Sequence, residues 1–128
     1  MIGESLAFHE AAQEGRLAFL NTGTGVAAVE VYGDDRPASV NDAPGTPLLV
    51  SIPLENPAGT ISAGILSLSP EDVGLILASG IATWARVINR NGDAAFDMDA
   101  GESGVECILS SAALFAGGSV ILVSANLG

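Results

Sequence analysis

The most conspicuous absence in this 128-residue sequence is lysine, and its only strongly basic residues are four arginines. With 15 aspartates and glutamates, the formal net charge is −11. A protein that grips DNA or RNA displaces phosphate counterions with several cations, so we expect no direct nucleic-acid binding. An anionic membrane surface is disfavoured for the same reason. Without lysine, residues 22–25 (Thr-Gly-Thr-Gly) are no phosphate-binding loop.

Cysteine and histidine occur once each, as Cys107 and His9. One cysteine excludes an internal disulfide and a multi-cysteine zinc site, and one histidine excludes a histidine pair around a metal. Cys107 lies in an apolar stretch, so we expect it to be a buried small hydrophobe. Residues 101–104 (Gly-Glu-Ser-Gly) lack the spacing of a nucleophile elbow. We therefore predict a non-enzyme with no catalytic, cofactor-binding or metal-binding residue.

Membrane and export signals are also missing. Residues 1–6 show no basic region followed by an apolar stretch, so we expect no signal peptide. Residues 107–128 carry no charge and are long enough to span a bilayer as a helix. However, Gly117 and Gly118 divide them into two short apolar runs, and no basic residue flanks them. We interpret the segment as two strands and a turn.

Apolar residues are plentiful: they make up 48% of the chain, against 15% charged residues, and the mean hydropathy is +0.47. One interpretation is that other subunits cover part of this apolar surface, which would make the chain a homo-oligomer or part of a larger assembly. The alternative is a globule rich in glycine and alanine that needs few charges. Composition leaves both open.

Sixteen glycines and six prolines indicate many tight connections between short elements, which favours strands. The length suits one domain. We predict an N-terminal helix and arm over residues 1–25, followed by an all-β domain over residues 26–128, an antiparallel β-sandwich or jelly roll. The helix is expected over residues 4–14, with Gly15 as a left-handed stop, and Arg16 to Leu20 either continue it or begin an extended segment. Its narrow apolar stripe, Phe8, Ala11 and Ala12, could dock weakly or pack on a neighbouring subunit.

The expected strands are residues 26–32, 48–52, 60–68, 80–88, 94–98, 105–109 and 119–124. Pro53 should confine the second to an edge or a bulge. Turns are expected at residues 56–59 and 89–92, and loops at residues 36–47 and 99–104. Residues 69–72 (Ser-Pro-Glu-Asp) suit one helical turn, and residues 73–78 suit helix or strand.

Alternation along residues 80–88 places Trp84 and Arg86 on one side of a strand. We interpret Trp84 as a core anchor with a stacked guanidinium; the alternative is a binding hot spot. Arg86 and Arg36 are expected to be ion-pair or stacking residues that fix the strand and the loop.

An acidic run comprises Asp93, Asp97, Asp99, Glu102 and Glu106. It lacks the ligand spacing of an EF-hand, and Asp97 and Asp99 would share one strand face, so a solvated corner is the simplest interpretation. Calcium binding is the alternative. A glycosidase would need two carboxyls across a cleft with aromatic platforms, and aromatic residues are few here.

Three segments together are similar to a family of small structural virion proteins of tailed phages and prophages. The first is Tyr32 followed by Arg36-Pro37. The second runs from Gly80-Ile-Ala-Thr-Trp84-Ala-Arg86 through Gly92-Asp-Ala94 to Asp97, and resembles the pattern GxAxWxR…GxAxxD. The third begins at Gly101 and closes with Ala116-Gly-Gly-Ser-Val120, an AGGxV pattern.

The resemblance covers residues 29–122 and implies an all-β virion component, with no catalytic residue to transfer. From it, and from the acidic charge, we expect a capsid cement or decoration protein that self-associates and binds the major capsid protein, in the virion. A neck or tail component is the first alternative. A carbohydrate-binding module is the second, and would need an exposed aromatic platform around Trp84. Residues 1–25 have no counterpart in the pattern.

Overall fold

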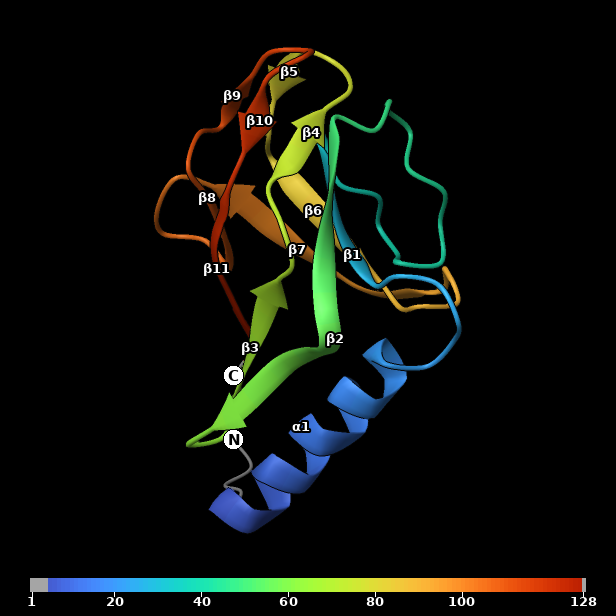
Figure 1. Cartoon of the computed structure of the whole chain (residues 1–128), viewed down its shortest axis with the longest axis vertical. Helices are drawn as coiled ribbons and strands as arrows, with labels where there is room; N and C mark the ends of the chain where they lie inside the picture. The colour runs from blue at the N-terminus through green and yellow to red at the C-terminus, as the bar shows by residue number, and fades with distance from the viewer. Residues whose placement is uncertain (1–4, 128) are drawn as a thin grey trace.

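The computed structural model describes residues 5–127, and in this range it has one helix and eleven strands. The bounds are α1 (Leu6–Leu20), β1 (Ala28–Tyr32), β2 (Val50–Ser62), β3 (Ile65–Pro70), β4 (Gly74–Ile76), β5 (Gly80–Ile81), β6 (Trp84–Ile88), β7 (Ala94–Gly101), β8 (Cys107–Leu109), β9 (Ala113–Leu114), β10 (Ser119–Val120) and β11 (Leu122–Leu127). The helix lies at one end of the molecule, and β4, β5, β9 and β10 gather at the other end (Figure 1).

Seven strands close into a barrel, in the order β1, β6, β7, β8, β11, β3 and β2. The ring closes because β1 pairs with β6 on one side and with β2 on the other, so neither strand ends the sheet. Strands β4 and β10 pair with each other and extend this sheet, while β5 and β9 form a separate two-stranded ribbon. The predicted all-β fold with a short N-terminal helix is confirmed. The sheet closes on itself, however, and does not clearly form a sandwich or jelly roll. It is also not purely antiparallel, because β7 pairs with β8 in parallel.

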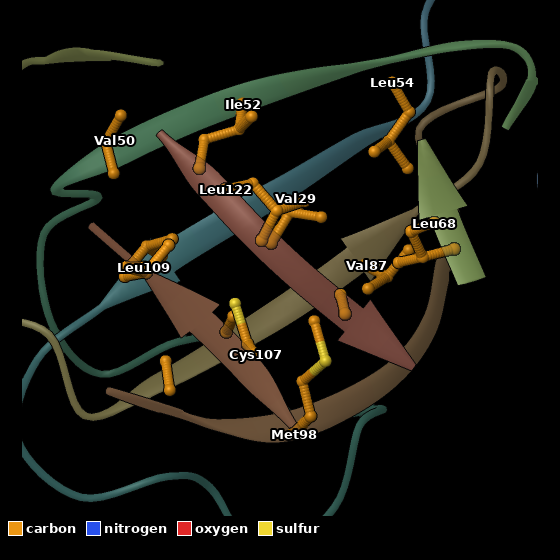
Figure 2. Close-up of a cluster of buried hydrophobic side chains, with 14 of the residues drawn as sticks. Val29, Val50, Ile52, Leu54, Leu68, Val87, Met98, Cys107, Leu109 and Leu122 are labelled. Carbon is orange, nitrogen blue, oxygen red and sulfur yellow. The ribbon is translucent and has the colours of Figure 1, made fainter. Parts of the chain in front are cut away.

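The barrel interior is filled by aliphatic side chains that alternate along each strand. Figure 2 shows this cluster, in which β1, β2, β6, β7, β8 and β11 all contribute. Its fully buried members include Val29, Ile52, Val87 and Leu109, each at most 2% exposed. Inward residues at every second position are the pattern that a closed sheet requires. Burial of this cluster is the main source of stability.

Strand β2 differs from the prediction, because residues 56–59 do not form a turn. The strand runs on through Pro53 and Pro57 to Ser62, with a register shift between Leu54 and Gly59. The Asn56–Pro57 peptide bond is cis. Pro53, expected at an edge or a bulge, lies opposite Ala28 of β1, and the register shift begins one residue later. The strand does not end there, because β1 pairs with its first half and β3 with its second. The turn falls at Ala63 and Gly64, both with positive φ.

Two further assignments change. Residues 69–72 form no helical turn, because Ser69 and Pro70 end β3, and Leu54 lies opposite Pro70. Residues 73–78 contain a strand, β4, as one of the two predicted alternatives. The expected strand over residues 80–88 is split into β5 and β6, since residues 80–81 pair with β9 while residues 84–88 join the barrel between β1 and β7.

Helix α1 is longer than the predicted core of residues 4–14, and residues 1–4 lie outside the described range. Gly15 does not stop it; the continuation over residues 16–20 is the correct alternative. The reason is burial, because Leu17 and Leu20 pack on the barrel, which outweighs the cost of about 1 kcal/mol for a glycine in a helix. The predicted stripe of Phe8, Ala11 and Ala12 does not dock on the barrel, because all three residues are exposed. Packing of the stripe on a neighbouring subunit stays a prediction.

The helix is held to the barrel by Gln13, which is fully buried. Its side-chain amide donates to the carbonyl oxygens of Gly64 and Leu127, and its own oxygen accepts from Arg16. Helix α1 thus rests on the β2–β3 turn and on the end of β11. At its C-terminal end, the Asn21 side chain accepts a hydrogen bond from the Ala58 N–H. These polar contacts fix the helix at one position on the barrel surface.

Residues 22–25 (Thr-Gly-Thr-Gly) pack against the turn of the β6–β7 hairpin. Gly23 has φ +117°, and a Cβ there would lie 2.3 Å from the backbone nitrogen of Asn91; at Gly25 a Cβ would lie 2.7 Å from the Arg90 carbonyl oxygen. The Gly25 N–H donates to that carbonyl at 2.8 Å. Only glycine permits this close approach of two backbones.

Gly23→Ala is expected to lower the free energy of unfolding by about 2 kcal/mol or more, because it adds a steric clash to the cost of positive φ. Gly92→Ala is the matched control: φ is +85°, but nothing lies within 4 Å of its Cβ position. Gly92→Ala should therefore lower the free energy of unfolding by only about 1–2 kcal/mol, the cost of placing alanine at positive φ. Urea denaturation of both variants measures the difference. Equal losses of unfolding free energy in the two variants would contradict close packing of Gly23 against the hairpin.

Candidate interaction surface

The Trp84–Arg86 side of β6 is a covered structural cluster. Trp84 stacks on Tyr32 at 4.6 Å between ring centroids, and its indole N–H donates to the Gly33 carbonyl. The Arg86 guanidinium lies 5.5 Å from the Trp84 ring centroid. Trp84 is 1% exposed. The predicted core anchor with a stacked guanidinium is confirmed, and Trp84 cannot offer a sugar-binding platform.

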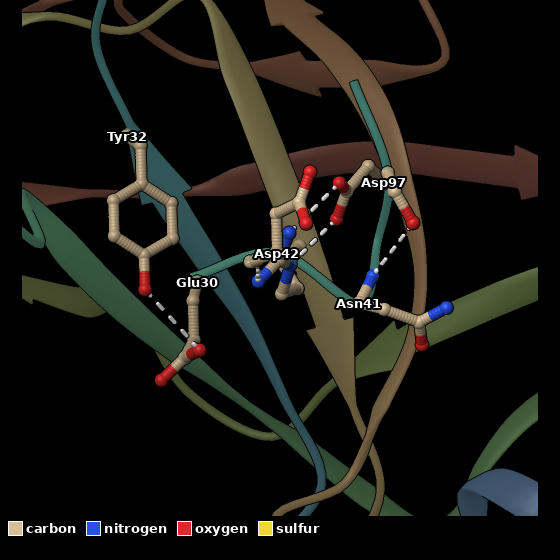
Figure 3. A network of polar contacts seen from close by, with 7 residues as sticks. Glu30, Tyr32, Asn41, Asp42 and Asp97 are labelled. Atoms are coloured by element: carbon tan, nitrogen blue, oxygen red, sulfur yellow. Dashed lines mark hydrogen bonds and ion pairs between the residues drawn. The ribbon is translucent and has the colours of Figure 1, made fainter. Parts of the chain in front are cut away.

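Arg86 connects three parts of the chain. It donates to both carboxylate oxygens of Asp97 on β7, at 2.7 and 3.0 Å. It also donates, at 2.7 Å, to the Asp42 carbonyl oxygen in the long loop, residues 33–49, that joins β1 to β2. Figure 3 shows Asp97 beside this loop and Tyr32 facing Glu30 on β1. The hydrogen bonds that Arg86 donates to the Asp97 carboxylate raise the pKa of Arg86. Burial, with a smaller contribution from Glu30, raises the pKa of Tyr32 to about 12. The cluster therefore fixes the loop over the sheet.

The acidic run does not converge on one point. Asp97 is paired with Arg86, Asp99 lies 3.7 Å from Arg36, and Glu102 accepts from the Ala112 N–H. In residues 5–127, no group of three or more His, Cys, Asp or Glu side chains is placed to hold a metal ion. The prediction of a solvated corner is confirmed for the exposed residues Asp93, Asp99, Glu102 and Glu106. It is wrong for Asp97, whose side chain is buried against Arg86. Both arginines form the expected ion pairs.

Cys107 and His9 lie on different parts of the fold. Cys107 faces the barrel interior and is fully buried, as predicted, whereas His9 lies on α1 beside the Gly64 turn. Burial raises the pKa of the Cys107 thiol to about 12. The single thiol and the single imidazole therefore form no nucleophile–base pair.

We expect Cys107 to resist an aromatic disulfide reagent in the folded chain and to react at once in denaturant. Its pKa is raised on folding, so the stability that its neutral form contributes is complete below pH 9. That contribution is lost as the pH rises from 9 towards 12, because only the unfolded thiol ionises freely there. Reagent titration and denaturation at several alkaline pH values measure this. Rapid labelling of the native chain would show that the thiol is accessible.

An uncharged patch of aliphatic side chains forms the outer face of β4 and of the β10–β11 segment. We call it the apolar wall; its members are Val73, Leu75, Leu77, Ile121 and Val123. Each is between 46% and 62% exposed. A barrel strand in contact with water normally alternates apolar-in and polar-out, but here the outward positions are aliphatic too. The wall is therefore an exposed apolar patch that the barrel itself does not use.

Pairing places these side chains together. Leu75 lies opposite Ser119, and Gly74 opposite Val120, so extending the antiparallel register by one residue sets Val73 opposite Ile121. Gly74, Ile76, Val120 and Leu122 face inward, which leaves the intervening positions outward. Val123 occupies a bulge between Leu122 and Ser124, and bulges re-aim side chains. Phe115, 71% exposed, follows β9 at the far end of the wall.

The wall was not identified from the sequence. The sequence feature that corresponds to the wall is a pair of stretches without charged residues, residues 73–85 and 107–128. In the structure these stretches pair with each other, β4 with β10 and β5 with β9. The four short strands in residues 107–127 replace the two strands and a turn that were expected. In residues 5–127 no helix is long and apolar enough to cross a membrane.

Comparison of the chain with protein-family models, curated proteins and solved structures found no match.

Proposed function

We propose that this chain is a structural, non-enzymatic subunit of a tailed-phage virion, and that it acts as a capsid cement or decoration protein bound to the major capsid protein. The observation that carries the proposal is the apolar wall, whose five side chains stay exposed to water in the isolated chain. Exposed patches of this kind mark protein–protein contacts. A subunit that acts by assembly needs such a surface and no reactive groups.

The positions of the motif residues support the same proposal. Tyr32, Trp84, Arg86 and Asp97, which carry the resemblance to phage virion proteins, lie in one contact cluster that holds the long loop over the sheet. Their contacts are architectural. The resemblance therefore concerns how the subunit is built, which is what a structural component of a particle would share with its relatives.

Charge supports a position away from packaged DNA. The net charge of −11 disfavours contact with phosphate, so an exterior position on the head suits the chain. Affinity for the shell would come from apolar and backbone contacts, with little contribution from charge pairs.

The test is to locate the protein in purified particles produced from the genome that encodes it. A cement protein is expected on the head at many copies, by mass spectrometry of virions and by antibody labelling in electron microscopy. Its loss should lower the temperature at which heads release DNA. Labelling confined to one vertex or to the tail would favour the neck or tail alternative. Absence from particles would overturn the virion proposal altogether.

A further inference from the structure

We propose that Asn91 is a site of spontaneous deamidation, and that the β6–β7 turn slows the reaction in the folded chain. The inference goes beyond the proposed function and does not depend on it, because it concerns the chemistry of this turn alone. Asn91 and Gly92 are both exposed at the tip of the hairpin. Of the six asparagines in the chain, only Asn91 precedes a glycine.

The reaction needs no reagent except water. The backbone nitrogen of Gly92 loses its proton and attacks Cγ of the Asn91 side chain. The new N–Cγ bond closes a cyclic imide, the Cγ–Nδ2 bond breaks, and ammonia leaves with a proton. Water then adds to one of the two imide carbonyl carbons and opens the ring, which gives aspartate or isoaspartate. Glycine at the second position favours ring closure, because it has no side chain to obstruct the approach.

Hydrogen bonds within the turn hold both reacting groups. The Gly92 N–H donates to the Asn89 carbonyl oxygen at 3.0 Å, so the attacking nitrogen keeps its proton in the closed turn. The Asn91 side-chain amide donates to the Asp93 carboxylate at 3.1 Å, which holds the leaving group toward Asp93. Because the nitrogen must be released before it can lose its proton, ring closure requires local opening of the turn.

Asn89 is the residue that keeps the turn closed. Its side chain is only 1% exposed, and its Oδ1 accepts from the N–H groups of Asn91 and Asp93 at 3.0 and 2.8 Å. A side-chain oxygen that spans a turn in this way fixes the backbone locally. On the other side, the segment between α1 and β1 packs against the turn through Gly23 (Figure 1). The turn is therefore held from both sides.

Deamidation would change the contacts of the turn in two ways. Aspartate at position 91 would place a second carboxylate beside Asp93, so repulsion would replace a hydrogen bond. Isoaspartate would add a methylene group to the main chain, at a point where the Asn91 nitrogen lies 2.3 Å from the position of a Cβ on Gly23. A lengthened turn no longer fits there. Deamidated protein is therefore expected to unfold at a lower denaturant concentration than fresh protein.

The first experiment compares the folded chain with the unfolded chain. Protein is kept in warm, mildly alkaline buffer with or without guanidinium chloride and then digested with trypsin, which cleaves after Arg90 and releases residues 91–128. Mass spectrometry with fragmentation follows the loss of the amide. Conversion of Asn91 should be about fivefold or more slower in the folded chain, the effect of one hydrogen bond on the attacking nitrogen. Asn126, in the same peptide but followed by leucine, should stay unchanged.

The second experiment tests the role of Asn89. Asn89→Ala removes the oxygen that spans the turn, so Asn91 of the folded variant should convert about fivefold faster than in the wild-type chain. Asn89→Asp is the matched control. It keeps that oxygen and replaces only Nδ2, which has no hydrogen-bond partner in the described part of the chain, so Asn91 should convert as slowly as in the wild type. Circular dichroism verifies that each variant is folded.

An Asn91 amide that persists in the unfolded chain would overturn the assignment of the site. Equal rates in the folded and unfolded wild-type chain would overturn the protection by the turn, and fast conversion in folded Asn89→Asp would overturn the role of the Asn89 oxygen. If Asn89→Ala does not fold, the wild-type comparison and Asn89→Asp still decide these points. None of these outcomes depends on whether the chain is found in virions.

Discussion

Asp97→Ala is expected to lower the free energy of unfolding by about 3–5 kcal/mol. The variant leaves the Arg86 guanidinium without its ion-pair partner, in a place where the two side chains are only 7% and 8% exposed. A buried charge that loses its partner keeps the cost of dehydration and loses the attraction that offset it. Arg86 also orders the loop through Asp42, so looser packing of this loop should accompany the loss.

The control lies two residues away on the same strand. Asp99 pairs with Arg36 at 3.7 Å, and these side chains are 56% and 41% exposed. Asp99→Ala should therefore cost less than about 1 kcal/mol, since exposed pairs contribute little. The double variant Arg86→Met with Asp97→Leu should be more stable than Asp97→Ala, because it removes both charges. Guanidinium denaturation measures all three. Similar losses for Asp97→Ala and Asp99→Ala would contradict the buried-pair interpretation.

Trp84→Ala is the second change with a large expected effect, again about 3–5 kcal/mol. It removes the largest fully buried side chain, its stacking on Tyr32, and its hydrogen bond to the Gly33 carbonyl. The Arg86 guanidinium loses the ring that it covers. Trp84→Phe should cost less, because a ring remains to stack although the hydrogen bond is lost.

The matched control is Phe115→Ala, another aromatic truncation but at an exposed site. It should change the free energy of unfolding of the isolated chain by no more than about 0.5 kcal/mol. Urea unfolding followed by far-ultraviolet circular dichroism compares the variants, since Trp84 is the only tryptophan and its removal abolishes the fluorescence signal. If Trp84→Ala were as mild as Phe115→Ala, the Trp84 cluster would not be a structural anchor.

Local patterns predicted several elements correctly. Strand β1, the Asn-Gly hairpin between β6 and β7, and the shared face of Trp84 and Arg86 follow from two-residue alternation and turn chemistry. The burial of Cys107 follows from its apolar neighbours. Such features depend on residues within a few positions of one another, so the sequence displays them directly.

Glycine and proline usually end a helix or a strand, but at two positions contacts with residues distant in sequence outweighed this tendency. Gly15 lies inside α1 because Leu17 and Leu20 beyond it are held by the barrel. Pro57 lies inside β2, in the stretch between Leu54 and Gly59 where the register shifts, because β1 pairs with the residues before it and β3 with the residues after it. The cost of one glycine or proline is a few kcal/mol, and burial of several aliphatic side chains exceeds it.

The sequence by itself determined the chemistry of this protein. Its composition excludes a phosphate-loop lysine, a disulfide and a histidine pair, and its alternating stretches dictate strands. Only the tertiary structure decided that β1 closes the sheet into a barrel and that Asp97 is buried against Arg86. It also decided that residues 73–77 and residues 121–123, more than 40 positions apart in the chain, form one exposed apolar wall. The reason is physical: strand pairing and burial join residues across long separations, and alternation along a strand does not specify which strand lies beside it.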